Sequence, residues 1–385
     1  MSTDDRNVEP DPIDIVHAHA VPFVLVHVCC LTAFWTGVTW QALVLCIGLY
    51  WLRIFAIGAG YHRYFSHRAF STSRAAQFVL AFLAQTSAQN SVLWWAAMHR
   101  RHHLFSDTAL DTHSPQRRGF FYAHVGWIFD AKHAKADLVQ VGDLARFPEL
   151  VWLDRFELAP AALAALACFV LAGWPGLVVG FMWSTVLVYH ATFCINSLAH
   201  VRGSRRYVTG DDSRNNGLLA LITMGEGWHN NHHACQSSVR QGFRWWEADA
   251  TFYILRVLSW IGLVWDLKLP PPSLVRGEQR LGARVIERAA EQLATRFNPE
   301  PIACAISAAL HGAELAALQA SLARAQNRAS EILAAMHLPQ VPSREAVVVR
   351  ARAMLAMTPS FDEIVDRAHC MLLAAVSERL AEVEP

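Results

Sequence analysis

The sequence predicts an all-α integral membrane protein. Four transmembrane helices in two hairpins would carry a cytosolic helical cap, followed by a C-terminal soluble helical appendix. Hydrophobic residues make up 54% of the 385 positions and charged residues 17%, against about 45–50% and about 25% in soluble domains. Two long runs, residues 15–52 and 158–201, contain no Asp, Glu, Lys or Arg. A spanning helix needs about 20 apolar residues, so each run is long enough for two.

The chain starts with a polar, acidic segment, residues 1–14, which does not have the pattern of a signal peptide. The net charge of +1 gives no basic surplus, so no nucleic acid is expected as a partner. Five of the eight cysteines lie in the two uncharged runs and none forms a CxxC pair, which favours reduced, buried thiols over disulfides.

Each uncharged run has a break near its middle, at Thr36-Gly37 in the first and at residues 173–176 (GWPG) in the second. The predicted spans therefore cover about 17–36, 39–59, 158–173 and 177–198. Two hairpins place residues 1–14, 61–157 and 202 onward on one side of the membrane. Eleven Lys or Arg residues lie between 61 and 157 and none in the short turns, so this side is predicted to be cytosolic.

Residues 75–98 are also free of charged side chains, but they include seven polar residues between Gln77 and Ser91. Hydrocarbon tolerates such residues poorly, and a fifth span would place its two ends on opposite sides. We therefore expect a helix that lies at the interface or is buried among its neighbours.

Nine histidines come out at the same predicted membrane face. The sets 99/102/103 and 229/232/233 both have the spacing i, i+3, i+4, which puts the side chains on one face of a helix. One cluster alone could be a polar helix end, but several clusters on one side favour a metal site. The nine are His62, His67, His99, His102, His103, His200, His229, His232 and His233; His113 is left unassigned.

Nine imidazoles exceed what a single ion can bind, so two metal ions would share them. Imidazole suits Zn, Cu, Fe and Ni about equally. A pair of redox ions with neutral ligands beside a membrane suggests oxygen chemistry rather than zinc-dependent hydrolysis, and iron is the preferred assignment.

The segments HRYFSH (62–67), HRRHH (99–103) and HNNHH (229–233) resemble the three histidine boxes of the membrane fatty-acid desaturases. RRGFFYAHVGW (117–127), INSLAH (195–200) and GEGWHNNHH (225–233) resemble the acyl-CoA Δ9 (stearoyl-CoA) branch more specifically. The likeness covers about residues 20–268, which assigns 15–269 to a membrane desaturase domain.

This resemblance implies an enzyme that uses O2 and two electrons to insert a cis double bond, at Δ9, into a saturated acyl chain of an acyl-CoA. It also implies a di-iron centre held by histidines in the cap. One iron would take His62, His67, His99, His103 and His232. The other would take His102, His200, His229 and His233, with Asn196 holding a water ligand.

Other residues near the boxes are weaker candidates. Asp107, Asp111 and Glu226 could fix the tautomers of the histidines or be ordinary surface carboxylates. The candidate substrate contacts, for which simple packing is the alternative, are Asn90, Trp95, Thr192, Phe193 and Lys132.

Two features leave the substrate and the partners open. The animal enzymes have an Arg-Asp pair before the second box, where this chain has Ala97 and Met98, so a lipid-linked or carrier-linked acyl chain remains an alternative to acyl-CoA. The sequence contains no apparent electron-carrier domain, so a separate ferredoxin, rubredoxin or b-type cytochrome is expected to supply electrons.

Residues 270–385 begin with three prolines and continue with Ala-, Leu-, Glu- and Arg-rich segments of helical periodicity. We expect a cytosolic helical region for docking or self-association, with a weakly ordered tail as the alternative.

For the whole chain, the alternatives are a di-iron lipid or hydrocarbon hydroxylase and a divalent-metal transporter. A transporter is expected to place its ligands near the bilayer midplane, whereas these histidines flank the spans.

Overall fold

The computed structural model describes residues 20–311 and 361–383, apart from residues 136 and 279. It is mostly helical, as the sequence predicts, with one small two-stranded sheet. The chain divides into two compact units, Met1–Arg206 with Asp212–Val275, and Tyr207–Asp211 with Arg276–Pro385. The predicted polar segment 1–14 and the first residues of the first predicted span lie outside the described residues.

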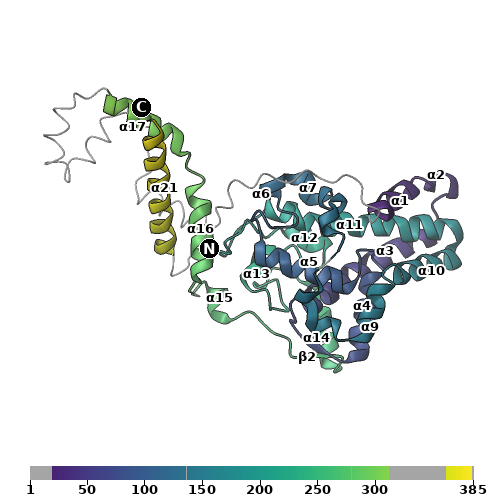
Figure 1. The fold of residues 1–385 in the computed structure, drawn as a ribbon. Helices are drawn as coiled ribbons and strands as arrows, with labels where there is room; N and C mark the ends of the chain where they lie inside the picture. Colours follow the sequence, from purple (N-terminus) through teal and green to yellow (C-terminus); the bar gives the residue numbers. More distant parts are fainter. Residues whose placement is uncertain (1–19, 136, 279, 312–360, 384–385) are drawn as a thin grey trace. The chain divides into compact units, whose positions relative to one another are not determined.

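The apolar helices of the first unit follow the two uncharged runs of the sequence (Figure 1). They are α1 (Val21–Cys30), α2 (Ala33–Thr36), α3 (Trp40–Ala56), α10 (Ala159–Pro175) and α11 (Ser184–Asn196). By length and composition two helical stretches of the described chain are candidate membrane spans, Trp40–Ser66 and Ala159–His200, and Val21–Thr36 is a shorter apolar helix. The arrangement as four spans stays a prediction.

The helices break near the positions that the sequence indicates. Thr39 begins α3, because its hydroxyl accepts a hydrogen bond from the backbone N–H of Ala42 at 3.3 Å. Gly37 follows α2 with φ +75°, a conformation that favours glycine. Ala172 and Gly173 have non-helical backbone angles within α10. The second candidate stretch therefore consists of two helical limbs on either side of this break.

Both stretches contain π-helix, at Ile57–Ser66 after α3 and at Gly176–Trp183 before α11. π-helical turns are rare and are frequent at functional sites. The first of these segments contains His62, which is buried.

One charged side chain, Arg53, lies inside the second predicted span. It is fully buried, and its Nη1 donates to Ser184 Oγ at 2.9 Å and to Thr185 Oγ1 at 3.0 Å. Its guanidinium carbon lies 4.6 Å from the centre of the Phe181 ring. Hydroxyl acceptors and an aromatic face partly offset the cost of burying this charge, and they join α3 to the segment around the start of α11.

The uncharged stretch 75–98 contributes to two helices rather than one. α4 (Arg74–Gln85) and α5 (Val92–Phe105) are separated by residues 86–91, where Ala88 and Asn90 have positive φ. The Ser91 hydroxyl begins α5 by accepting a hydrogen bond from the backbone N–H of Trp94 at 3.1 Å. α4 and α5 both pack against the π-helical segment Ile57–Ser66.

A buried core lies next to the histidine-bearing segments and includes Phe65, Leu80, Leu93 and Leu255. Strand β1 (Ser71–Thr72) pairs antiparallel with β2 (Val264–Trp265). This pairing joins the segment after His67 to the end of helix α14 (Ala250–Trp260).

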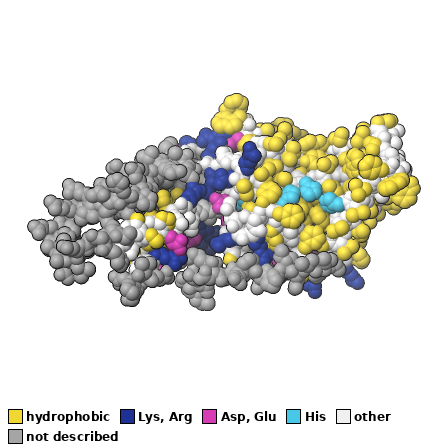
Figure 2. All heavy atoms as spheres, turned by 90° about the horizontal axis from the view of Figure 1, so that it is seen from above, with side chains coloured by type: hydrophobic (Ala, Val, Ile, Leu, Met, Phe, Trp, Pro, Cys, Tyr) yellow, Lys and Arg dark blue, Asp and Glu magenta, His cyan; other side chains and the backbone are white. Residues whose placement is uncertain are grey.

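Short helices complete the first unit. They are α6 (Pro115–Arg118), α7 (Phe120–His124), α8 (Gly142–Ala145), α9 (Pro148–Arg155), α12 (Gly217–Ile222) and α13 (His229–Ala234), with 3₁₀ turns at Gly126–Phe129, Ala131–His133, Leu138–Val141 and Leu198–His200. Figure 2 shows hydrophobic side chains covering one end of the face in view, with Lys and Arg side chains gathered away from that end.

After α15 (Pro272–Arg276), the described helices of the second unit are α16 (Ala283–Ala294), α17 (Pro299–His311) and α21 (Phe361–Val383). α16 and α21 bury Leu293 and Ile364 in a small core that also contains Val208. Part of the predicted helical appendix, residues 312–360, lies outside the described residues.

Candidate metal centre

The nine histidines singled out in the sequence come together in two groups, and in each group one ring nitrogen per residue lies within 4.8 Å of the others. The first group comprises His62, His67, His99, His103 and His232. The second comprises His102, His200, His229 and His233. These are the two sets that the resemblance implies for two metal ions.

The local helix geometry explains how α5 serves both groups. His99 and His103 are one turn apart, so they share a face and both join the first group. His102 is rotated by about 100° from His103 and joins the second group. On α13 the same step separates His232, in the first group, from His233, in the second.

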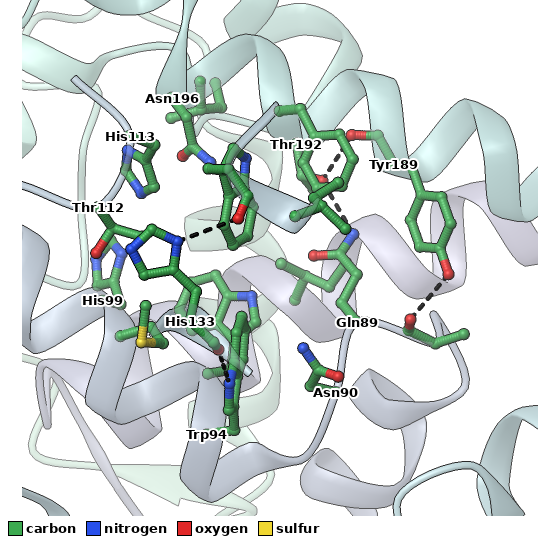
Figure 3. A pocket seen from close by; sticks show the side chains of 18 of the residues that line it. Gln89, Asn90, Trp94, His99, Thr112, His113, His133, Tyr189, Thr192 and Asn196 are labelled. Atoms are coloured by element: carbon green, nitrogen blue, oxygen red, sulfur yellow. Dashed lines mark hydrogen bonds between the residues drawn. The ribbon is translucent and has the colours of Figure 1, made fainter. Parts of the chain in front are cut away.

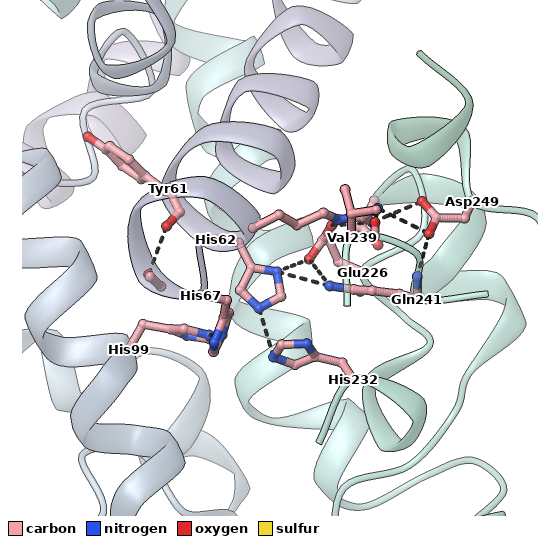
Figure 4. Close-up of polar contacts among 12 residues, drawn as sticks. Tyr61, His62, His67, His99, Glu226, His232, Val239, Gln241 and Asp249 are labelled. Carbon is pink, nitrogen blue, oxygen red and sulfur yellow. Dashed lines mark hydrogen bonds and ion pairs between the residues drawn. The ribbon is translucent and has the colours of Figure 1, made fainter. Parts of the chain in front are cut away.

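In the first group, ring Nε2 atoms face one another (Figure 4). The Nε2 atom of His62 lies 2.9 Å from that of His232, and the Nε2 atom of His232 lies 2.9 Å from that of His103. The Nε2 atom of His99 lies 3.0 Å from that of His103 and 2.9 Å from that of His67.

This arrangement fits a metal cation. His62 donates its Nδ1–H to the carboxylate of Glu226, so its Nε2 presents a lone pair to the other rings. Nδ1 of His103 and Nδ1 of His232 are buried without a hydrogen-bond partner among the described residues. A cation that accepts the Nε2 lone pairs suits this set of neutral imidazoles better than a network of N–H···N bonds.

The second group is more deeply buried than the first, and all four of its histidines are inaccessible to solvent or nearly so. Nε2 of His200 lies 3.1 Å from Nε2 of His229. The rings of His102 and His233 lie 5.4 Å apart, centre to centre. This group could hold a second cation.

Each predicted carboxylate contacts one of these histidines. Asp111 Oδ1 accepts from Nδ1 of His102 at 2.9 Å, and Asp107 Oδ2 accepts from Nδ1 of His200 at 2.9 Å. Glu226 accepts from Nδ1 of His62. Such contacts fix the tautomer, so that Nε2 is left for a metal.

Two of these carboxyl groups stay ionised. Burial by itself would raise the pKa of Glu226, but the nearby charge of Arg63 and the contact with His62 lower it to about 2. Burial would likewise raise the pKa of Asp111, but His102 lowers it below its usual value. Negative groups beside the imidazoles strengthen them as ligands.

Several histidines are held neutral, the form that binds metals. Burial, reinforced by the neighbouring imidazoles, places the pKa values of His67, His99, His103 and His232 well below the usual 6.5. The interior position therefore keeps their ring lone pairs available at neutral pH.

A buried ion network behind His62 was not found by sequence reasoning. Arg63 Nη2 contacts Glu226 Oε1 at 2.8 Å and Asp249 Oδ1 at 2.9 Å. Asp249 also accepts from the backbone N–H of Gln241 at 2.7 Å. The sequence offers one sign of this network, a charged residue, Arg63, between His62 and His67. Its partner Asp249 could not be identified from the sequence, because the two residues are 186 positions apart.

His113 is also buried, and it forms a further group with His102 and Asp111. Its ring centre lies 4.5 Å from that of His102. Burial, together with the nearby His102, lowers the pKa of His113 to about 3, so this ring is neutral beside the second group.

A cavity of about 370 Å³ begins at the histidine groups. His99 lines one part of it, and Gln89 and Tyr189 line another (Figure 3). His102 and His229 are also lining residues. The predicted contacts Asn90, Trp95, Thr192 and Phe193, and also Asn196, are among its lining residues. Lys132 is exposed on a neighbouring turn and is not among the lining residues.

Hydrogen bonds fix the wall of this cavity. Gln89 Nε2 donates to Thr192 Oγ1 at 2.9 Å, and the Tyr189 hydroxyl donates to the carbonyl of Ala88 at 2.8 Å (Figure 3). The ring of Phe23, from α1, stacks on Tyr189 with 5.5 Å between centres. This part of the wall is therefore mainly apolar and aromatic, and its polar side chains Gln89, Thr192 and Tyr189 are all hydrogen-bonded.

Three other histidines form a chain away from the metal centre. His190 Nε2 lies 3.1 Å from His27 Nε2, and His190 Nδ1 lies 3.0 Å from His124 Nε2. Because His190 uses both ring nitrogens, this is a hydrogen-bonded chain that joins α1, α11 and α7.

The family model described as fatty acid desaturase matches residues 38–260. An acyl-CoA 5-desaturase of Anemone leveillei is 37% identical over 248 residues, which cover 63% of this chain and 77% of the relative. An sn-1 stearoyl-lipid 9-desaturase of Synechocystis is 37% identical over 261 residues, covering 65% and 80%. A palmitoyl-monogalactosyldiacylglycerol delta-7 desaturase of Arabidopsis thaliana is 38% identical over 236 residues, covering 60% and 63%.

Proposed function

The chain belongs to the fatty acid desaturase family, whose members are oxidoreductases, and from this premise we propose its reaction in more detail. We propose that it inserts a cis double bond at Δ9 into a saturated acyl chain. One acyl chain, O2, two electrons and two protons give the unsaturated chain and two water molecules. The Δ9 position is supported by relatives named as 9-desaturases, while others are named for positions 5 and 7.

In this proposal the two histidine groups hold two iron ions. The first group would bind one iron, and the second group would bind the other with a water held by Asn196. Bound iron would supply the activation of O2 and the removal of two hydrogens from neighbouring methylene groups, which amino-acid side chains do not offer.

The observation that carries this proposal is that both histidine groups help to line one largely apolar cavity. His62 and His99 belong to the first group, His102 and His229 to the second, and all four are lining residues. A fatty-acyl chain is the kind of ligand that such a cavity holds. The rigid aromatic wall would align one pair of carbons with the metals and exclude water.

The acyl carrier and the membrane arrangement belong to the same proposal. We favour acyl-CoA as the substrate, and acyl-lipid as the alternative, because the relatives carry both descriptions. The protein would cross the membrane four times, with the metal centre on the cytosolic side. A separate ferredoxin, rubredoxin or b-type cytochrome would supply electrons.

The test is expression in a host that lacks its own membrane desaturase, with an electron donor co-expressed, followed by fatty-acid analysis. A new cis monounsaturated acid is expected, and it should disappear in His99→Ala and in His233→Ala, which remove one ligand from each group. An alcohol product would indicate a hydroxylase instead. Absence of any new product, with iron bound and the donor active, would contradict the proposal.

A further inference from the structure

An exposed apolar surface lies outside the candidate spans, on residues 218–261 of the first unit. On α12, Leu218 and Leu221 are 70% and 69% exposed. On α14 and just after it, Trp260 and Ile261 are 72% and 67% exposed. The 218–261 surface, as we name it, consists of Leu218, Leu221, Trp245, Trp246, Val257, Trp260 and Ile261.

Helix α14 is apolar on two sides. Leu255 is fully buried in the main core, as is the side chain of Thr251. Val257, Trp260 and Ile261 have the spacing i, i+3, i+4 and form an exposed side away from that core. A helix in contact with water would be polar on that side, so this side is suited to an apolar partner.

This surface continues from a candidate membrane span. Ile222, at the end of α12, lines one apolar groove together with Ile47 and Trp51 of α3, and its carbonyl accepts from the Tyr50 hydroxyl at 2.7 Å. The backbone N–H of Thr251, in the first turn of α14, donates to the carbonyl of Met224 at 2.9 Å. Ile222 therefore joins the end of α12 to α3, and Met224, two residues further along, joins the turn after α12 to the start of α14.

The charges around the surface point to the same partner. Three of the four carboxylates in residues 218–268, Glu226, Glu247 and Asp249, are buried and paired with arginines. The exposed charges are those of Arg256, Lys268 and Asp266. Tryptophan side chains beside basic residues are typical of the membrane–water interface.

We propose that the 218–261 surface lies in the headgroup region of the bilayer that the spans cross, so that α12 and α14 anchor the metal-binding part of the protein to the membrane. Phospholipid is the partner. This inference rests on the membrane placement in the proposed function and is independent of the reaction. Its rivals as partners are a second copy of the chain, residues 276–385, and a separate protein.

The test uses the full-length protein in membranes that contain radiolabelled phospholipid. The photoreactive residue p-benzoylphenylalanine replaces Val257 or Leu221, with Ile47 on α3 as the span control and the exposed Gln116 on α6 as the polar control. After illumination, Val257 and Leu221 should give labelled lipid adducts at a yield close to that of Ile47 and about tenfold above that of Gln116.

The other outcomes overturn specific statements. Adducts at Val257 and Leu221 that contain protein, while Ile47 still captures lipid, would overturn this inference and leave the membrane spans intact. Equal lipid yields at Gln116 and Val257 would also overturn it, because the 218–261 surface would then contact lipid no more than a polar surface does. Absence of lipid at Ile47 would contradict the membrane placement itself.

Discussion

At the residue scale, carboxylates behind the histidines decide which ring nitrogen is left to face a metal ion in the proposed centre. Glu226 accepts from Nδ1 of His62 and binds Arg63, and Asp111 accepts from Nδ1 of His102. Each contact removes one tautomer of the ring, so in the proposed metal centre the ligand atom would be selected before an ion binds.

Glu226→Gln is expected to weaken metal binding and activity by about 10–100-fold. The amide would present a donor either to Nδ1 of His62 or to Arg63, and both of these are donors already. The measurement is iron per chain together with product formation. Glu278→Gln, which alters an exposed pair with Arg276, is the matched control and should leave both unchanged.

The metal-free protein is expected to lose stability as the pH falls below 6.5. Burial lowers the pKa values of His67, His99 and His232 in the folded state, so the unfolded chain takes up protons on these rings first, at their usual pKa of 6.5. Wherever the unfolded chain binds more protons than the folded chain, stability falls as the pH falls. Thermal unfolding of the metal-free protein at pH 8 to 5 measures this, and a midpoint that does not change would count against neutral buried rings.

At the scale of elements, the site depends on close approach between backbone segments. A Cβ on Gly227, just before α13, would lie 2.1 Å from the backbone N of Ala220 and 2.6 Å from the carbonyl oxygen of Asn216. The turn that delivers His229 to the second group therefore has no space for a side chain.

Gly227→Ala should destabilise the protein by about 3 kcal/mol or more, because the overlap is with backbone. It should also lower the iron content, since α13 must shift. Gly48→Ala is the matched control, because its Cβ would meet no atom within 4 Å and helical alanine is favoured over glycine by about 1 kcal/mol. Thermal unfolding and iron analysis of both variants check this, and equal behaviour would contradict the packing described.

An alanine inserted between Arg100 and Arg101 should abolish the shared site. It turns His102 and His103 by about 100° relative to His99, and activity should fall by about 100-fold or more. The same insertion between Gly277 and Glu278, outside the first unit's helices, should leave iron binding intact. Retained iron in the α5 variant would show that the helical phase of these histidines is unimportant.

At the scale of the whole molecule, the family match and both histidine groups lie outside residues 276–385. The model match covers 38–260, and the second unit has a small core of its own. Each unit thus buries its own apolar residues.

A chain ending at Val275 is therefore expected to keep its iron content. Its activity per bound iron should stay within about threefold of that of the full-length protein. The yield should fall, because Val208 packs in the core of the second unit and would be uncovered. Fatty-acid analysis and iron determination of the truncated and full-length proteins provide the comparison. Complete loss of iron from a truncated protein that is still folded would contradict this independence.

The helical spacing of six of the nine histidines, 99/102/103 and 229/232/233, could be predicted from sequence because i, i+3, i+4 periodicity is a local property of a helix. The assignment to family was confirmed by the comparisons. His62 and His67, five positions apart, share no helical face, and their place in the first group depends on the π-helical segment. The break between α4 and α5 was not predicted, although the sequence around Asn90 is rich in polar residues.

The amino-acid sequence by itself determined the uncharged runs, the histidine pattern and through it the family, since composition and periodicity depend on neighbouring positions. Only the tertiary structure decided that the imidazoles of the two expected sets lie within reach of one another, that Arg63 joins Glu226 to Asp249 across 186 positions, and that α14 is apolar on both sides of its axis. Those features depend on packing between segments distant in the chain, and local patterns do not specify which buried charge will meet which partner.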